Sequence, residues 1–141
     1  MILQRDGRFR KEIQEEGCYL MCILWFANKF TNMQIEPSSV SDGMYTLFMR
    51  HGWMNERCRI LDPEAMLNWC GVDCVYTDRH ETPSRMCDKR EFEILYWKHP
   101  EYGGHFTAGD GRGRVTYDPW GVSKAATEGA LISKRIFRLN L

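Results

Sequence analysis

Two short stretches of this sequence carry side chains that could catalyse acyl transfer. Cys18 follows Gly17 at the start of a strongly apolar run, and His105 and Asp118 lie in a glycine-rich stretch much later in the chain. A cysteine thiolate is a strong nucleophile, and an imidazole oriented by a carboxylate can take up and return its proton. These residue types suggest a nucleophile, a general base and an orienting acid, provided that the fold brings them together.

Cys18 stands where a buried helix is expected to begin. Residues 17–27 are apolar on every side rather than along one stripe, which is typical of a helix surrounded by core. We predict a helix from about Cys18 to Phe30. The unpaired N–H groups and the positive dipole at its first turn favour a thiolate. The alternative is that Cys18 is a small buried hydrophobic residue, as most free cysteines are.

We predict that His105 and Asp118 lie on the two arms of one β-hairpin. With a two-residue turn at residues 111–112, His105 faces Asp118 and Ala108 faces Val115. This register puts apolar residues on one side of the hairpin and polar residues on the other. Residues directly opposite have Cβ atoms about 4.5–5.5 Å apart, so the imidazole and the carboxylate can form a hydrogen bond.

Two glycines precede His105 and would let a substrate backbone come close. They are Gly103 and Gly104. The alternative interpretation of His105 is a surface histidine on a solvated strand face. The other three histidines of the chain have no comparable carboxylate partner in the sequence.

The order of the remaining elements indicates an α+β fold. Helices are expected to start at Pro37 and at Pro63, where Asp62 provides an N-cap. The polar segment 4–16 reads as an arm or loop. Strands are expected at residues 72–77, 92–98, 105–109, 114–118 and 134–139, the last with one solvated face. Helices followed by strands predict an antiparallel sheet packed against the central helix, with residues 1–141 forming a single domain.

Composition and charge exclude several classes of partner. The chain has 141 residues, of which 43% are hydrophobic, so it can fold around a core. Its formal net charge is zero, which lacks the basic surplus of a sequence-independent nucleic-acid binder. The apolar run is too short to span a bilayer. We therefore expect neither a nucleic-acid partner nor a membrane.

The cysteines do not indicate a disulfide framework or a metal site. The first residues do not resemble a signal peptide, so we expect a reducing, cytoplasmic location. The pairs Cys18/Cys22 and Cys70/Cys74 have a CxxxC spacing that does not fit a closed zinc site. No metal or other cofactor is expected. A redox pair of Cys18 with Cys22, one helical turn away, is an alternative.

Three motifs appear in the chain order Cys, His, Asp. They are Gly17-Cys18, Gly104-His105-Phe106 and Tyr117-Asp118-Pro119. Their order and contexts resemble the papain-like cysteine peptidases, in particular the branch that includes the double-glycine-leader (bacteriocin-processing) peptidases. The likeness runs from Gln4 to Trp120. It implies a papain-like fold and a thiol protease that cleaves a peptide or amide bond in a peptide or protein substrate.

The resemblance also implies a role for each site residue. Cys18 would be the nucleophile, His105 the general base and acid, and Asp118 the residue that orients the imidazole. A glutamine would donate a hydrogen bond to the oxyanion, together with the Cys18 N–H. Gln4 is preferred for this role, and Gln14, which lies closer to Cys18 than is usual in the family, is the alternative.

Two other functions stay open from the sequence. A papain-like domain without activity would serve as a binding or inhibitory protein, as would suit a phage or another mobile element. A cell-wall peptide amidase also uses cysteine and histidine, but its usual Cys-to-His spacing is shorter than the one found here. Fast alkylation of Cys18 by iodoacetamide would favour an enzyme, and slow labelling of all cysteines would favour a binding protein.

Overall fold

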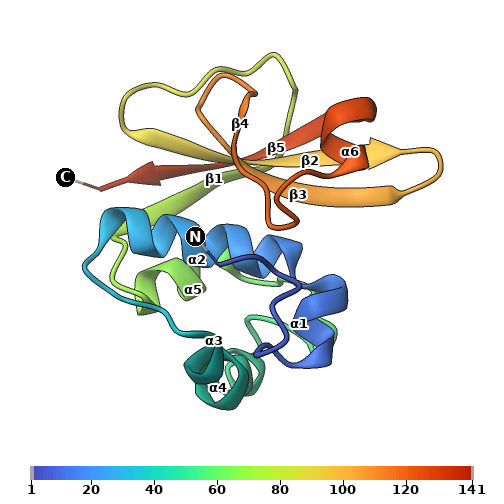
Figure 1. Ribbon diagram of the computed structural model, residues 1–141. Coiled ribbons are helices and arrows are strands. Elements are labelled where there is room, and N and C mark those ends of the chain that lie inside the picture. The colour runs from blue at the N-terminus through green and yellow to red at the C-terminus, as the bar shows by residue number, and fades with distance from the viewer. Residues whose placement is uncertain (1, 141) are drawn as a thin grey trace.

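The helical segments that precede the first strand of the computed structural model lie on one face of an antiparallel sheet (Figure 1). The structure describes residues 2–140, and for residues 78–81 it describes the backbone alone. The helical segments are α1 (Lys11–Glu16), α2 (Cys18–Phe30), α3 (Pro37–Ser39), the π-helical η1 (Val40–Met44), α4 (Tyr45–Arg50), α5 (Pro63–Trp69) and α6 (Lys124–Glu128). The strands are β1 (Cys74–Glu81), β2 (Glu91–His99), β3 (Gly103–Gly109), β4 (Val115–Tyr117) and β5 (Ala130–Leu139). The predicted α+β class is confirmed.

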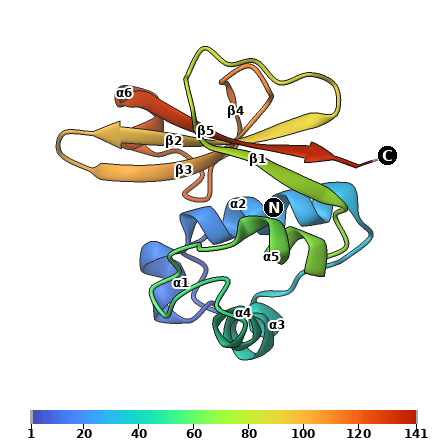
Figure 2. The same ribbon diagram turned by 180° about the vertical axis from the view of Figure 1, so that it is seen from behind.

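Helix α2 runs beneath the sheet and forms the centre of the core. It begins at Cys18 and ends at Phe30, as the apolar run predicts. Its aromatic side chains pack on the strands: Phe26 lies against Phe92 of β2, with ring centroids 4.6 Å apart. Seen from behind, α5 lies beside α2 on the same side of the sheet (Figure 2). Burial on several sides explains why the helix is apolar all round.

Capping explains where α5 begins and ends. The Asp62 side chain accepts a hydrogen bond from the N–H of Ala65 at 3.0 Å, and Pro63 occupies the first position of α5. Gly71 follows this helix with a φ of 100°, a left-handed conformation that suits glycine.

The helical stretch predicted after Pro37 is present as α3, η1 and α4 in succession.

The sheet has the strand order β1-β5-β2-β3-β4, and all its pairs are antiparallel. The five strands are those expected from the sequence, with longer ends in β1, β2, β3 and β5. Because β5 inserts between β1 and β2, the last strand of the chain is an interior strand. Within residues 2–140, no helix has the length and apolar character needed to cross a bilayer.

The predicted hairpin register is wrong. Ala108 pairs with Tyr117 rather than Val115, and the ladder shifts at Gly109. The connection is not a two-residue turn but a wider loop, closed by a hydrogen bond from the Asp110 N–H to the Arg114 carbonyl at 2.9 Å. The Asp110 carboxylate also accepts from the N–H of Arg114, which holds the loop open at this width.

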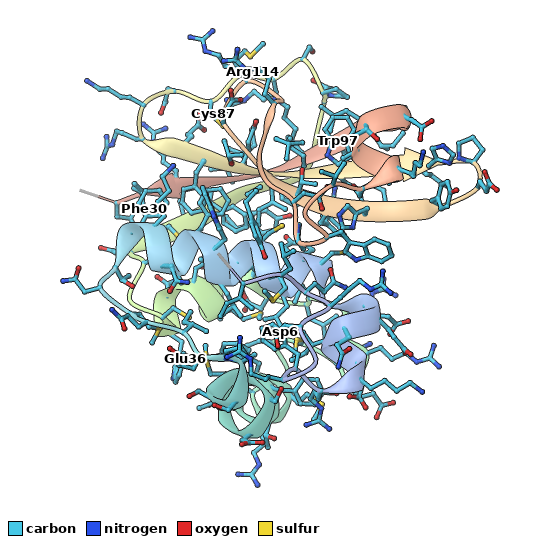
Figure 3. The ribbon with its side chains drawn as sticks, viewed as in Figure 1. Asp6, Phe30, Glu36, Cys87, Trp97 and Arg114 are labelled. Carbon is cyan, nitrogen blue, oxygen red and sulfur yellow. The ribbon has the colours of Figure 1, made fainter. Side chains whose placement is uncertain are left out.

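The prediction that β5 has one solvated face is also wrong. Lys134 is fully buried and forms a 2.9 Å ion pair with the fully buried Glu93 of β2. The other carboxylate oxygen of Glu93 accepts hydrogen bonds from the N–H groups of Gly111 and Gly113. Figure 3 shows Cys87 and Arg114, from the two loops over this region, on the face of the sheet opposite α2. The two loops therefore cover the face of β5 that carries Lys134, which the alternation of basic and apolar residues had predicted to be solvated.

Two short helices were not predicted. The segment expected to be an arm or loop contains α1, whose Ile13 is buried and lies one turn after the buried Phe9. This apolar i, i+4 pair was the available signal. Helix α6 packs on β2 and β3, and Ser123 caps its N-terminus.

Candidate active site

Cys18 is the first residue of α2, at a sharp corner with α1. A Cβ atom on Gly17 would lie 2.5 Å from the carbonyl oxygen of Ile13, so only glycine allows the two helices to meet this closely. No side chain caps α2, which leaves the amide groups of its first turn without a side-chain partner. Cys18 is half-buried and lines a pocket, whereas most cysteines of the chain are buried.

His105 lies beside both other members of the predicted set. Its Nε2 lies 2.7 Å from Oδ1 of Asp118, and the Cys18 thiol is near enough to raise the pKa of the ring. Since Nε2 is engaged by the carboxylate, a neutral ring carries its proton there and Nδ1 is the basic nitrogen. The hydrogen bond that the sequence predicts between His105 and Asp118 is therefore confirmed, although the register that suggested it is not.

The surroundings of His105 favour its charged form. Burial alone lowers its pKa, but the hydrogen bond with Asp118 and the interaction with the nearby Cys18 outweigh this effect and raise the pKa to about 9. The imidazole is thus protonated at neutral pH.

Asp118 is held by three donors. Besides His105, the Ser123 hydroxyl donates to Oδ2 at 2.6 Å and the Trp120 N–H donates to Oδ1 at 2.9 Å. Burial raises the pKa of this carboxyl, but the hydrogen bonds from His105, Ser123 and Trp120 outweigh burial and lower it. The carboxylate is therefore charged and fixed in orientation.

Ser123 is a part of the site that sequence reasoning missed, and Trp120 also belongs to the site. The Ser123 side chain also accepts from the N–H of Ala126, so one hydroxyl joins the start of α6 to Asp118. A serine before the run at residues 124–128 is an N-cap signal that could have identified it. The Trp120 ring packs edge-on against the His105 ring, with centroids 6.0 Å apart, and Arg5 lies over the same indole. Trp120 thus shields the His105–Asp118 pair from water.

Of the two candidate glutamines, Gln4 lies at the site. Its backbone N–H donates to the carbonyl of Pro119, next to Asp118, and its side-chain amide donates to the carbonyl of Gln14 at 3.1 Å. The Gln4 side chain is buried, and its Oε1 has no hydrogen-bond partner among the described residues. The Gln14 amide instead donates to the carbonyl of Phe9 at 2.7 Å.

Gly104 makes room for a side chain of the protein rather than for a substrate. A Cβ atom at this position would lie 2.3 Å from the hydroxyl oxygen of Tyr96. The expectation that this glycine opens the site to a substrate backbone is therefore wrong at position 104. Gly103 has a φ of 75° and forms the turn before β3.

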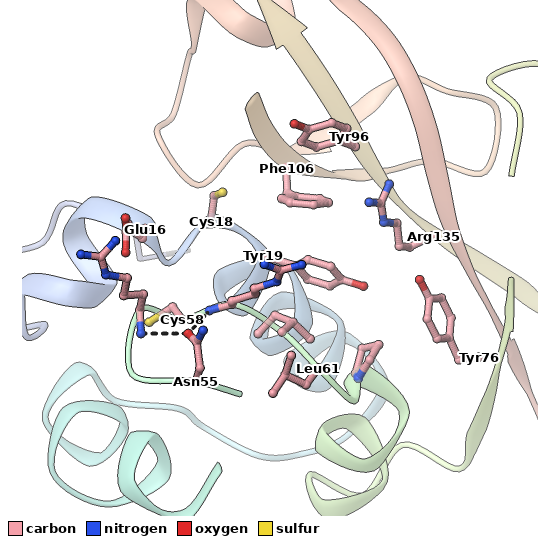
Figure 4. Close-up of a pocket in the computed structure, with 14 residues that line it drawn as sticks. Glu16, Cys18, Tyr19, Asn55, Cys58, Leu61, Tyr76, Tyr96, Phe106 and Arg135 are labelled. Atoms are coloured by element: carbon pink, nitrogen blue, oxygen red, sulfur yellow. Dashed lines mark hydrogen bonds between the residues drawn. The ribbon is translucent and has the colours of Figure 1, made fainter. Parts of the chain in front are cut away.

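A pocket of about 830 Å³ opens beside Cys18 (Figure 4). Tyr19 of α2 and Phe106 of β3 form one part of its wall, with ring centroids 4.4 Å apart. Residues 57–61 and Arg135 of β5 line other parts. The volume lies in the range of ligand-binding clefts, so a substrate could reach the thiol from this side.

Comparison with known families identifies a family for this chain but no activity. A family model described as "Protein of unknown function, DUF261" matches residues 1–139. The chain belongs to this family. No curated protein and no solved structure matches it. The function of this DUF261 protein therefore has to be argued from the site itself.

The other cysteines of the DUF261 chain do not form a competing site. Cys22 is fully buried, and burial raises the pKa of its thiol well above the ordinary value. A thiol in such surroundings is a poor redox partner for Cys18. Within the described side chains, no cluster of three or more histidine, cysteine or acidic residues could hold a metal ion.

Proposed function

We propose that this protein is a papain-like cysteine hydrolase that cleaves a peptide or amide bond. The observation that carries the proposal is the position of the His105 ring, which is hydrogen-bonded to the Asp118 carboxylate and lies near the Cys18 thiol. The position of Cys18 at the start of a central helix and the antiparallel sheet over that helix are consistent with a papain-like arrangement.

The first half of the proposed reaction forms an acyl-enzyme. The Cys18 thiolate attacks the scissile carbonyl carbon, a C–S bond forms, and the carbonyl oxygen becomes an oxyanion. The Cys18 N–H and the Gln4 amide are the proposed donors to this oxyanion. Protonated His105 then gives its proton to the leaving nitrogen as the C–N bond breaks.

The second half releases the acyl group. His105, now neutral, takes a proton from water, and the resulting hydroxide attacks the acyl carbon. The C–S bond breaks, which yields a carboxylic acid and returns Cys18 and His105 to their starting charges. Asp118 keeps the imidazole oriented and stabilises its positive charge in both halves.

The test is the alkylation of the cysteines by iodoacetamide at neutral pH, followed by mass spectrometry of the modified peptides. We expect Cys18 to react much faster than the other five cysteines, and the His105→Ala variant to lose this difference. The Cys18→Ala variant should keep the circular dichroism spectrum of the wild type. Equally slow labelling of all six cysteines would reject the proposal and favour a papain-like binding protein without activity.

A further inference from the structure

The pocket beside Cys18 contains a buried cation. The Arg135 side chain lines the pocket although the residue is only 8% exposed. Its guanidinium lies over the rings of Tyr96 and Phe106, 5.3 and 5.1 Å from their centroids, and donates to the Ser133 hydroxyl. Among the described side chains, no carboxylate lies within ion-pair distance of Arg135.

Such an arrangement favours an anion beside the guanidinium. Arginine is almost never fully buried without a partner, because removing its charge from water is expensive. The two aromatic faces and one hydroxyl compensate for part of this cost. The guanidinium has five N–H donors, and the Ser133 hydroxyl uses one of them. The remaining donors can bind a group that enters the pocket.

The rest of the pocket also favours a negative group. Two further cations, Arg57 and Arg59, line it. Among the described side chains, the sole acidic lining residue is Glu16, which lies on the side of Cys18. In Figure 4 the Phe106 and Tyr19 side chains lie between Cys18 and Arg135. A substrate that extends from the thiol across these two rings therefore meets Arg135.

We propose that Arg135 binds a carboxylate of the substrate, so that the enzyme acts beside an acidic residue of a peptide. This inference rests on the proposed function, because it assigns the specificity of the same site. A planar guanidinium matches a carboxylate through two parallel hydrogen bonds, and such charge-assisted pairs are strong when water is excluded. The neutral amide of glutamine or asparagine lacks the charge that the buried cation requires.

The binding test compares two small probes that differ only in this charge. They are N-acetylglutamate α-amide and N-acetylglutamine α-amide, titrated into the ¹⁵N-labelled wild-type protein. We expect a saturable shift of the Arg135 Nε–H resonance in NMR spectra and an affinity about tenfold or more higher for the acid. The Nε–H resonance of Arg138, which is exposed on the same strand, is the internal control. The absence of a saturable shift, or equal affinity for both probes, would overturn the assignment.

Two variants test whether Arg135 is the residue responsible. Arg135→Gln should remove the preference for the acid, and Arg135→Lys, which keeps the charge and the contact with the rings, should retain part of it. Arg138→Gln should bind both probes as the wild type does. A preference that survives in a folded Arg135→Gln variant would contradict the proposal.

These measurements do not depend on turnover. Slow labelling of Cys18 by iodoacetamide would reject the proposed hydrolase whatever the result of the titration. Fast labelling of Cys18 together with equal binding of the two probes would reject the role of Arg135 alone. The two proposals can therefore fail separately.

Discussion

The Asp118 carboxylate lies 2.7 Å from Nε2 of His105, although the two residues are not opposite each other in the β3–β4 ladder. Asp118 follows the last residue of β4, in the loop that leads to α6. There the Trp120 N–H and the Ser123 hydroxyl bind the same carboxylate. The contact with His105 therefore depends on the loop and the start of α6 as much as on the pairing of the strands.

Protein stability should fall as the pH rises through the pKa of His105. This pKa is about 9 in the folded protein, against an ordinary value of 6.5, so folding favours the protonated ring. The stabilising contribution is complete below pH 6.5 and is lost as the pH approaches 9. Its size is up to about 3 kcal/mol. Urea unfolding from below pH 6.5 to above pH 9 measures it.

The matched control for this pH dependence is Asp118→Asn. Without the carboxylate, burial dominates and the pKa of His105 should drop, so the variant should lose most of the decline in stability. Parallel stability curves for the two proteins over this pH range would contradict the assignment.

Gln4→Ala should lower turnover without slowing the alkylation of Cys18. The Gln4 amide is proposed to bind the oxyanion, which forms during acyl transfer and not during reaction with iodoacetamide. Loss of one such donor typically costs about 10²- to 10³-fold in kcat. The measurement compares two rates in the wild type and in the variant. One is the hydrolysis of a peptide amide that the wild type cleaves, and the other is the labelling of Cys18 by iodoacetamide.

Gln14→Ala is the control for the choice between the glutamines. Its side chain points to Phe9, and the contact that Gln4 makes with residue 14 uses the backbone carbonyl, which alanine keeps. We expect kcat to change little in this variant. A larger loss in Gln14→Ala than in Gln4→Ala would reverse the assignment of the oxyanion donor.

Gly17→Ala should destabilise the protein by about 1–3 kcal/mol, as overpacking typically does. The φ of Gly17 is −91°, so the cost comes from contact with the Ile13 backbone and not from the dihedral angle. Gly7→Ala is the matched control, because a Cβ atom there meets nothing within 4 Å. Thermal or urea unfolding of both variants measures the difference. A Gly17→Ala variant as stable as Gly7→Ala would show that the corner between α1 and α2 does not require glycine.

Local signals in the sequence determined several elements of this fold. The bounds of α2 follow from a run of apolar residues, and the start of α5 follows from Asp62 and Pro63. These signals act within a few residues, so no knowledge of the rest of the chain is needed to interpret them. The pairing of His105 with Asp118 was also predictable, because both residues flank a single hairpin.

Other features depend on residues that the chain brings together from far apart. Lys134 looks like a solvated residue until Glu93 and two loops cover it, and the same carboxylate accepts hydrogen bonds from Gly111 and Gly113 in the hairpin loop. Gln4 reaches the site because its backbone pairs with Pro119. The sequence by itself thus determined the class of fold and the pairing of His105 with Asp118. The tertiary structure decided the strand register, the position of Gln4 and the burial of Arg135 in the pocket, because each depends on contacts between distant segments.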